Sequence, residues 1–165
     1  MALRNILTEE NATLKKKSRP VTKFDERLHI LLDDMQETLL DAGGVGLAAP
    51  QVGILKRLFI VDTGDEILEC INPELVEMTG EQTGAEGCLS VPGKYGVVTR
   101  PNKVKLRAQD RDGEWFEAEA EELIARCFCH EYDHLDGHLY TEIASRMLTQ
   151  EELEALSAQQ EEENE

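Results

Sequence analysis

The segment from residue 129 to 134, which reads Cys-His-Glu-Tyr-Asp-His, constrains this chain most strongly. Successive residues of an α-helix are about 100° apart, so residues four positions apart share a face. His130 and His134 can therefore reach one metal ion if the segment is helical, with the carboxylate of Glu131 beside them. His-Glu-x-x-His is a signature of metal-dependent hydrolases. An ordinary amphipathic helix with polar residues is the alternative that the segment alone leaves open.

The size and composition of the chain indicate one globular domain. Its 165 residues are enough for one well-formed core and too few for two ordinary domains. No apolar run approaches the roughly 18 residues that would suggest a membrane span. The first residues lack the apolar core and cleavage site of a secretory signal. We therefore expect a cytoplasmic protein with a single functional site.

The charge of the chain argues against electrostatic binding of nucleic acid over a large surface. The formal net charge is -17, and binding to phosphates needs clustered Lys and Arg. The basic run at residues 15–17, together with Arg19, is expected to be a solvated loop. Acidic residues accumulate after Arg146 without any further Lys or Arg. Such a block is expected to extend into solvent.

The cysteines are expected to be reduced thiols that serve as core residues or ligands, because no export signal precedes them. No two of them are spaced as Cys-x-x-Cys, which disfavours a structural zinc site built from four thiolates. The four are Cys70, Cys88, Cys127 and Cys129.

Apolar periodicity predicts a first helix over residues 25–42, ended by Gly43 and Gly44. Residues 44–51, rich in small side chains, read as a loop or an edge segment that another backbone can approach closely. The middle of the chain predicts strands in a largely antiparallel or mixed sheet, with a hairpin turn at residues 112–113. The strands are expected at residues 57–61, 67–72, 75–79, 96–99, 104–108 and 114–120.

A second helix is predicted from Glu121 to a stop at Gly137. Leu123, Cys127, His130 and His134 form one stripe along it, so this face is expected to pack inward. A last helix is predicted from Thr149, whose pairing with Glu152 matches a capping box, and it is expected to fray beyond about residue 158.

Two histidines are too few for a catalytic metal site, which typically has three protein ligands and one open position. His138 lies just beyond the Gly137 stop and does not match the spacing of a metzincin protease. A third ligand is therefore expected from another segment, and Cys127, on the same predicted helix as His130, is the rival candidate.

Three short motifs together resemble the peptide deformylase family. They are Gly-Val-Gly-Leu-Ala-Ala-Pro-Gln at residues 44–51, Glu-Gly-Cys-Leu-Ser at residues 86–90, and His-Glu-Tyr-Asp-His at residues 130–134. The order of helix, sheet and metal-bearing helix also fits, so the resemblance covers roughly residues 6–147. It implies an α+β fold with mixed, largely antiparallel sheets around a central metal-bearing helix, flanked by an N-terminal and a C-terminal helix. We expect residues 1–147 to form the catalytic domain and residues 148–165 an acidic helix and tail.

The resemblance implies a role for each motif residue. Cys88 becomes the third metal ligand beside His130 and His134, with water in the fourth position. Glu131 is expected to act as the general base and then to carry the proton to the departing amine. The Gln51 amide and the Leu89 backbone N–H are expected to stabilise the oxyanion. Gly46 and its neighbours are expected to bind the peptide as an added strand.

The implied substrate is an N-formylmethionyl peptide of a nascent protein, and formate is the implied product. Thiolate and imidazole ligands accept Fe(II), Zn(II), Ni(II) and Co(II) alike, and the family suggests Fe(II) as the native ion. The methionine side chain is expected to enter a pocket near Arg126, Cys127 and His130. A monomer is expected. Transient ribosome association stays open, although the acidic tail does not match the basic C-terminal helix of some bacterial members.

Cys129 stands where many family members have Gln, and Tyr132 and His138 stand where apolar residues are frequent. Three alternatives remain. One is a zinc endopeptidase that uses His130, His134 and an acidic third ligand. Another is a non-catalytic, metal-containing module that only captures peptides. The third is a redox sensor built on Cys127 and Cys129.

Overall fold

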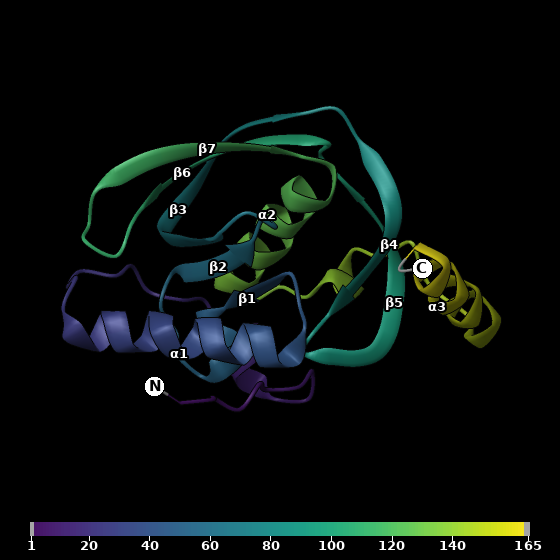
Figure 1. The fold of residues 1–165 in the computed structure, drawn as a ribbon, viewed down its shortest axis with the longest axis horizontal. Coiled ribbons are helices and arrows are strands. Elements are labelled where there is room, and N and C mark those ends of the chain that lie inside the picture. Colours follow the sequence, from purple (N-terminus) through teal and green to yellow (C-terminus); the bar gives the residue numbers. More distant parts are fainter. Residues whose placement is uncertain (1, 164–165) are drawn as a thin grey trace.

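The structure, a computed structural model, describes the backbone of residues 2–163 and the side chains of residues 2–159 (Figure 1). Two antiparallel sheets surround a central helix, as the α+β prediction requires. The larger sheet has the order β1-β2-β3-β6-β7, and the smaller one has the order β4-β5-β8. The strands are β1 (Gly46–Ala48), β2 (Leu58–Asp62), β3 (Ile67–Thr79), β4 (Gln82–Cys88), β5 (Val91–Arg100), β6 (Lys103–Gln109), β7 (Trp115–Glu121) and β8 (Arg146–Met147).

Three α-helices accompany the sheets: α1 (Glu26–Ala42), α2 (Glu122–Leu135) and α3 (Gln150–Glu163). Short 3-10 helices lie at Ala12–Lys15, Ala49–Val52 and Tyr140–Glu142. α1 begins where the Asp25 side chain accepts a hydrogen bond from Leu28 N, and it ends at Gly43, whose φ of 70° suits glycine. No helix within the described residues is both long and apolar enough to cross a bilayer.

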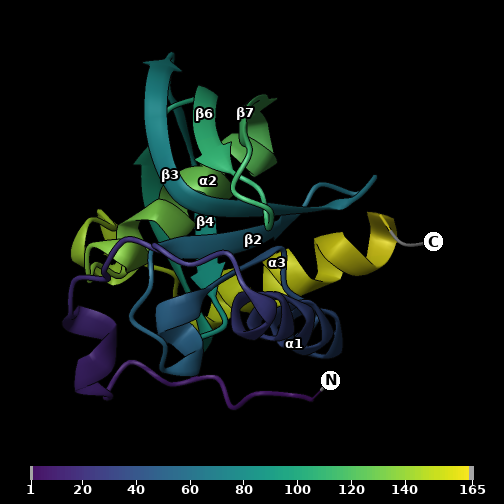
Figure 2. The same cartoon turned by 90° about the vertical axis from the view of Figure 1, so that its left-hand side faces the viewer.

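Strand β2 separates two cores because its sequence is apolar on both faces. Phe59 and Val61 join the core beneath α2, whereas Leu58 and Ile60 join the core beneath α1. Neighbouring residues of a strand point to opposite faces, so α1 and α2 must cover opposite sides of the larger sheet. Figure 2 shows this layering, with α1 and the N-terminal segment on one side of β2 and α2 on the other.

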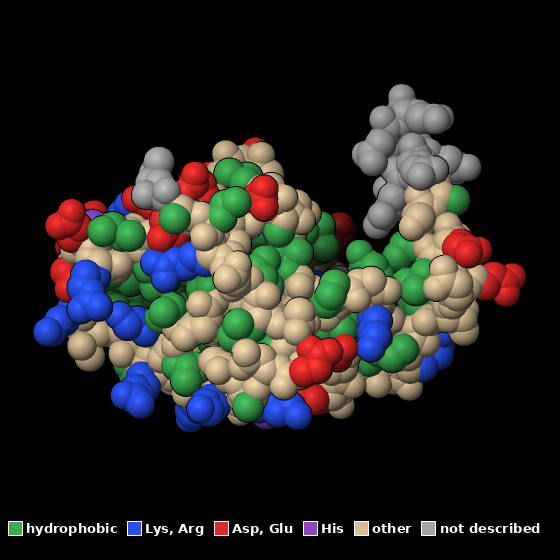
Figure 3. Space-filling view, turned by 90° about the horizontal axis from the view of Figure 1, so that it is seen from below, with side chains coloured by type: hydrophobic (Ala, Val, Ile, Leu, Met, Phe, Trp, Pro, Cys, Tyr) green, Lys and Arg blue, Asp and Glu red, His purple; other side chains and the backbone are tan. Residues whose placement is uncertain are grey.

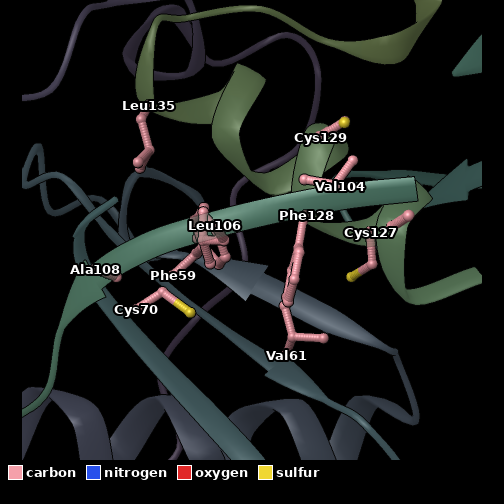
Figure 4. Packing of buried hydrophobic residues seen from close by; sticks show 12 residues of the cluster. Phe59, Val61, Cys70, Val104, Leu106, Ala108, Cys127, Phe128, Cys129 and Leu135 are labelled. Carbon is pink, nitrogen blue, oxygen red and sulfur yellow. The ribbon is translucent and has the colours of Figure 1, made fainter. Parts of the chain in front are cut away.

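The core around α2 is made of apolar side chains from the helix and the strands β2, β3 and β6 (Figure 4). Phe128 on α2 lies against Phe59, with ring centroids 6.4 Å apart, and both rings are fully buried. Cys70 is buried in the same core, and all four cysteines are free thiols. This packing fixes the helix that carries the two histidines.

Several strand predictions need correction. The two strands predicted at residues 67–72 and 75–79 form one strand, β3, whose register shifts between Ile71 and Glu74. Asn72 makes this possible because it adopts a positive φ of 51° while its side chain bonds both backbone polar groups of Val21. Strands β4 and β8 were not predicted. The segment at residues 44–51 contains the edge strand β1, which agrees with the predicted loop or edge segment.

One helix prediction differs from the structure. Leu123 does not pack inward with the rest of its stripe, since it is 58% exposed near the start of α2. The last helix spans Gln150–Glu163, and its fraying beyond about residue 158 stays a prediction. Its capping box is confirmed, because Thr149 N donates to Glu152 and Glu152 N donates to the Thr149 hydroxyl. Residues 164–165 lie outside the described residues.

The charged residues of the surface are distributed unevenly. The basic run at residues 15–17 is exposed, and so is Arg19. None of these side chains forms an ion pair with a described residue, as expected for a solvated loop. Figure 3 shows Lys and Arg side chains along the left end and lower margin of the face that α1 covers.

Candidate metal centre

Cys88, His130 and His134 converge although they come from different parts of the fold. Cys88 ends strand β4 of the smaller sheet, and the two histidines lie one turn apart on α2. Their ligand atoms all lie within 4.8 Å of one another, and the Cys88 Sγ to His134 Nε2 distance is 3.4 Å. Among the described residues this is the one group of His, Cys, Asp or Glu side chains close enough to hold a metal ion.

The donor set fits a divalent transition metal. One sulfur and two imidazole nitrogens leave a fourth tetrahedral position for water or substrate. Burial and the neighbouring His130 hold the pKa of His134 well below its usual range, which favours the neutral ring that binds metal. His134 Nδ1 is buried and has no hydrogen-bond partner among the described residues.

Glu86 lies behind His130 and orients its ring. The Glu86 Oε2 atom is 2.6 Å from His130 Nδ1, so the other nitrogen, Nε2, is left to face the ligand cluster. Arg100 donates to both Glu86 oxygens at 3.1 and 2.8 Å, and Arg126 donates at 2.9 Å. Burial alone would raise the pKa of Glu86, yet His130 and Arg100 bring that pKa to about 2. The carboxylate is therefore fixed and charged.

Gln51 is held so that its amide nitrogen faces Cys88. Its Oε1 atom accepts a hydrogen bond from Ala48 N at 2.9 Å, which fixes the orientation of the amide. The Nε2 atom then donates to Ser90 Oγ at 3.0 Å and lies 3.6 Å from Cys88 Sγ. Ser90 N lies 3.4 Å from the same sulfur. Because Gln51 is almost fully buried, this arrangement is rigid.

Glu131 lies on α2 between the two histidines, close to Cys127 and Gly46. Its Oε1 atom is buried and has no partner among the described residues, and its Oε2 atom lies 3.9 Å from Cys127 Sγ. In the protein alone, burial raises the pKa of Glu131 to about 7. A Cβ at Gly46 would lie 2.6 Å from Cys127 Sγ and 2.8 Å from Glu131 Oε2, so any larger residue there would force these side chains to move.

A cavity of about 550 Å³ opens beside the cluster. It runs between β1, the edge strand of the larger sheet, and β4, the edge strand of the smaller one. Its lining includes His130 and Glu131 as well as the exposed Leu123. An extended peptide could pair with a strand edge in this cleft.

The cleft brings together the residues singled out in the sequence. Gly46, Gln51, Cys88, Leu89, His130 and Glu131 all line the cavity. Leu89 follows β4 in a turn, and its side chain lies so close to Gly44 that a Cβ there would come within 2.8 Å. Cys127 points to Glu131 rather than into the ligand cluster.

Sequence reasoning did not identify Glu86, Arg100 and Ser90 as parts of the site. Glu86 and Ser90 belong to the motif at residues 86–90, so their proximity to Cys88 in the sequence was the available signal. Nothing in a single sequence indicated that Arg100 would meet Glu86.

Comparisons with known proteins agree with this geometry. The family model described as polypeptide deformylase matches residues 3–150. The chain belongs to the peptide deformylase family. A peptide deformylase of Clostridium botulinum is 61% identical over 140 residues, which are 85% of this chain and 95% of the relative. One from Agathobacter rectalis is 58% identical over 86% of this chain and 90% of its own length.

Solved deformylase structures share the fold. That of Thermotoga maritima has a TM-score of 0.85 and 41% identity, covering 87% of this chain and 98% of its own. A deformylase of Legionella pneumophila has a TM-score of 0.84 and 40% identity, covering 96% and 97%. The chain is thus a metal-dependent hydrolase that removes the N-formyl group from formylmethionyl peptides of nascent proteins. Neither the zinc endopeptidase nor the non-catalytic, metal-containing module is favoured by these comparisons.

Proposed function

We propose that Cys88, His130 and His134 hold one divalent ion and that this ion is Fe(II) in the native protein. The convergence of the three ligand atoms within 4.8 Å of one another carries this proposal. The donor set also accepts Zn(II), Ni(II) and Co(II), and the Fe(II) assignment comes from the resemblance to the family. When bound, such an ion supplies Lewis-acid activation of a water molecule and of the formyl carbonyl.

Glu131 is the proposed general base. It lines the cleft next to both histidines, and its Oε1 atom has no partner among the described residues. The carboxylate takes a proton from the attacking water as the new bond from oxygen to the formyl carbon forms. It then gives that proton to the nitrogen as the carbon–nitrogen bond breaks. Formate and the free amine of the peptide are the products.

Gln51 and Leu89 are the proposed donors to the oxygen of the formyl group. Negative charge develops on that oxygen during attack, and fixed N–H donors stabilise it most when they need no reorientation. The bonds of Gln51 to Ala48 and Ser90 supply this rigidity. The Leu89 backbone N–H belongs to the turn directly after the ligand Cys88.

Gly46 is the proposed contact for the peptide backbone. It lies on the free edge of β1, and its lack of a side chain keeps the approach to Glu131 open. The methionine side chain is proposed to lie along α2, beside Arg126, Cys127 and His130, all of which line the cleft. A formyl carbon bears only hydrogen, so a narrow site can exclude acetyl and longer acyl groups.

The proposed working unit is a monomer in the cytoplasm, where nascent chains are made. All proposed ligands and donors come from one chain, so the site needs no second subunit. Residues 1–147 are the proposed catalytic unit, with residues 148–165 as an appended acidic segment. This segment is proposed not to bind ribosomes, because its negative charge repels the negative phosphates of RNA.

The proposal is tested with protein purified without oxygen. Formate release from formyl-Met-Ala is measured together with the metal content of the same sample. We expect about one ion per chain, formate release from the formyl substrate, and no acetate release from acetyl-Met-Ala. Cleavage of internal bonds in an unformylated peptide would instead support the endopeptidase.

A further inference from the structure

A second hollow lies beside the active-site cleft, against the C-terminal helix. It has a volume of about 430 Å³ and lies between Gly93, Tyr95 and one face of α3. Gly93 and Tyr95 also line the active-site cavity, so the two hollows share a border. We call the second hollow the α3 groove. Its other lining residues are Gln150, Leu153, Glu154, Leu156, Ser157 and Ala158.

Tyr95 links the proposed metal site to this groove. Its ring covers Gly87, the residue before Cys88, so closely that a Cβ on Gly87 would come within 2.6 Å of the ring. The Tyr95 carbonyl accepts a hydrogen bond from Leu148 N at 2.8 Å, just before α3 begins. Tyr95 therefore touches the residue before Cys88 with its ring and the segment before α3 with its backbone carbonyl.

An exposed ion pair joins the first turn of α3 to strand β8, and several residues of α3 line the groove. Arg146 bonds both oxygens of Glu152 at 2.6 and 2.8 Å. Gln150, Leu153, Glu154 and Ser157 follow the i, i+3, i+4, i+7 spacing of one helix face. Figure 1 shows α3 projecting from the end of the molecule that carries β4 and β5.

We propose that the α3 groove receives the substrate residues that follow the second residue of the formyl peptide. This inference rests on the deformylase function. A peptide with its formyl group at Cys88, His130 and His134 must leave the cleft on an open side, and the border at Gly93 and Tyr95 provides one. An extended chain advances about 3.3 Å per residue, so three residues span about two turns of helix.

The lining sets the class of side chain that the groove accepts. Tyr95, Leu153 and Leu156 offer apolar surface, and Glu154 is the one charged residue of the lining. Lys94, at the nearby rim of the cleft, is already paired with Glu9 at 3.1 Å. The groove should therefore favour apolar or basic side chains and disfavour acidic ones at the third and fourth positions.

The test compares kcat/KM for formyl-Met-Ala-Lys-Leu and formyl-Met-Ala-Glu-Leu, each relative to formyl-Met-Ala, which ends before the groove. For the wild type we expect the Lys peptide to be preferred about twofold to fivefold at low salt, with the preference shrinking in 0.5 M KCl. Glu154→Lys should abolish or reverse the preference. Glu151→Lys, the same charge change outside the lining, should keep it.

Equal rates for the two peptides in the wild type, or equal effects of the two variants, would overturn the proposal. Leu153→Ser should raise KM for both tetrapeptides relative to formyl-Met-Ala. If it instead changes only the sedimentation of the protein, the groove is an interface between two copies. Failure to release formate from formyl-Met-Ala would contradict the proposed function itself, so the two failures are distinguishable.

Discussion

Glu86 shows how one buried side chain can determine the shape of a metal site. It bonds His130 directly and is bonded in turn by Arg100 and Arg126. A charged carboxylate surrounded by two guanidinium groups has one stable position, so the imidazole ring beside it has one as well. The position of the proposed ligand thus depends on residues that never touch the ion.

Glu86→Gln keeps the shape of the side chain but removes its charge. Two buried guanidinium groups then face a neutral amide, and the free energy of unfolding should fall by about 3 kcal/mol or more. Metal affinity should fall roughly 10- to 100-fold because His130 loses its orienting partner. Denaturant titration and metal titration measure the two effects.

Glu117→Gln is the matched control for this change. Glu117 also pairs with a cation, Lys105 at 3.1 Å, but it is exposed on β7. We expect less than about 1 kcal/mol of destabilisation and unchanged metal affinity. Equal losses in the two variants would contradict the orienting role of Glu86.

Gly46→Ala should reduce activity without unfolding the protein. The added Cβ would lie 2.6 Å from Cys127 Sγ and 2.8 Å from Glu131 Oε2, so Glu131 must shift. A displaced base should lower kcat/KM about 100-fold or more. In Gly84→Ala the nearest atom is 3.7 Å away, and formate release should change little. Normal activity of Gly46→Ala would show that the strand edge tolerates a side chain.

Helix α2 combines structural and chemical roles on different faces. Phe128 packs into the core against Phe59, whereas His130 and His134 face the ligand cluster. Burial of the apolar face holds the helix, and the helix spacing then places both rings. This combination explains why the helix and its histidines could be predicted from a single sequence.

Phe128→Ala should destabilise the protein strongly. Removal of a fully buried ring should lower the free energy of unfolding by about 3 to 5 kcal/mol, as measured by denaturant titration. Leu123→Ala, on the same helix but 58% exposed, should cost less than about 0.5 kcal/mol. A similar loss for both would mean that Phe128 is not part of the core.

The strands were harder to predict than the helices. The segment Gln82–Cys88 carries two glycines and a buried Glu86 and lacks the β-branched alternation that indicates a strand. It becomes β4 only because β5 pairs with it along its length. Asn72 and Pro73 predicted an interruption between two strands. In the structure, hydrogen bonds from the Asn72 side chain to Val21 allow β3 to continue across both residues. Formation of these two strands depends on residues far away in the sequence, which local sequence patterns do not reveal.

The candidate site joins residues that are far apart in the chain. Gln51, Cys88 and His130 come from three separate segments, and only the packing of both sheets around α2 brings them together. The three motifs were sufficient to identify these residues. Ser90 lies inside one of these motifs, but its bond to Gln51 became evident only from the structure, and Arg100 lies outside all three motifs.

Metal binding at such a site should contribute to the stability of the whole molecule. An ion present at 1,000 times its Kd stabilises the folded state by about 4 kcal/mol. A chelator that removes it should therefore lower Tm by roughly 10 °C for a chain of this size. Cys88→Ala should show a lower Tm that the chelator no longer changes. A chelator effect of the same size in both proteins would place the ion elsewhere.

The most direct test of the account is formate release by Glu131→Ala, measured on anaerobically prepared protein whose metal content is determined in the same sample. The proposed ligands Cys88, His130 and His134 remain, so the variant should keep about one ion per chain while kcat falls about 100-fold or more. Full activity with the ion in place would contradict the role of Glu131 as the general base.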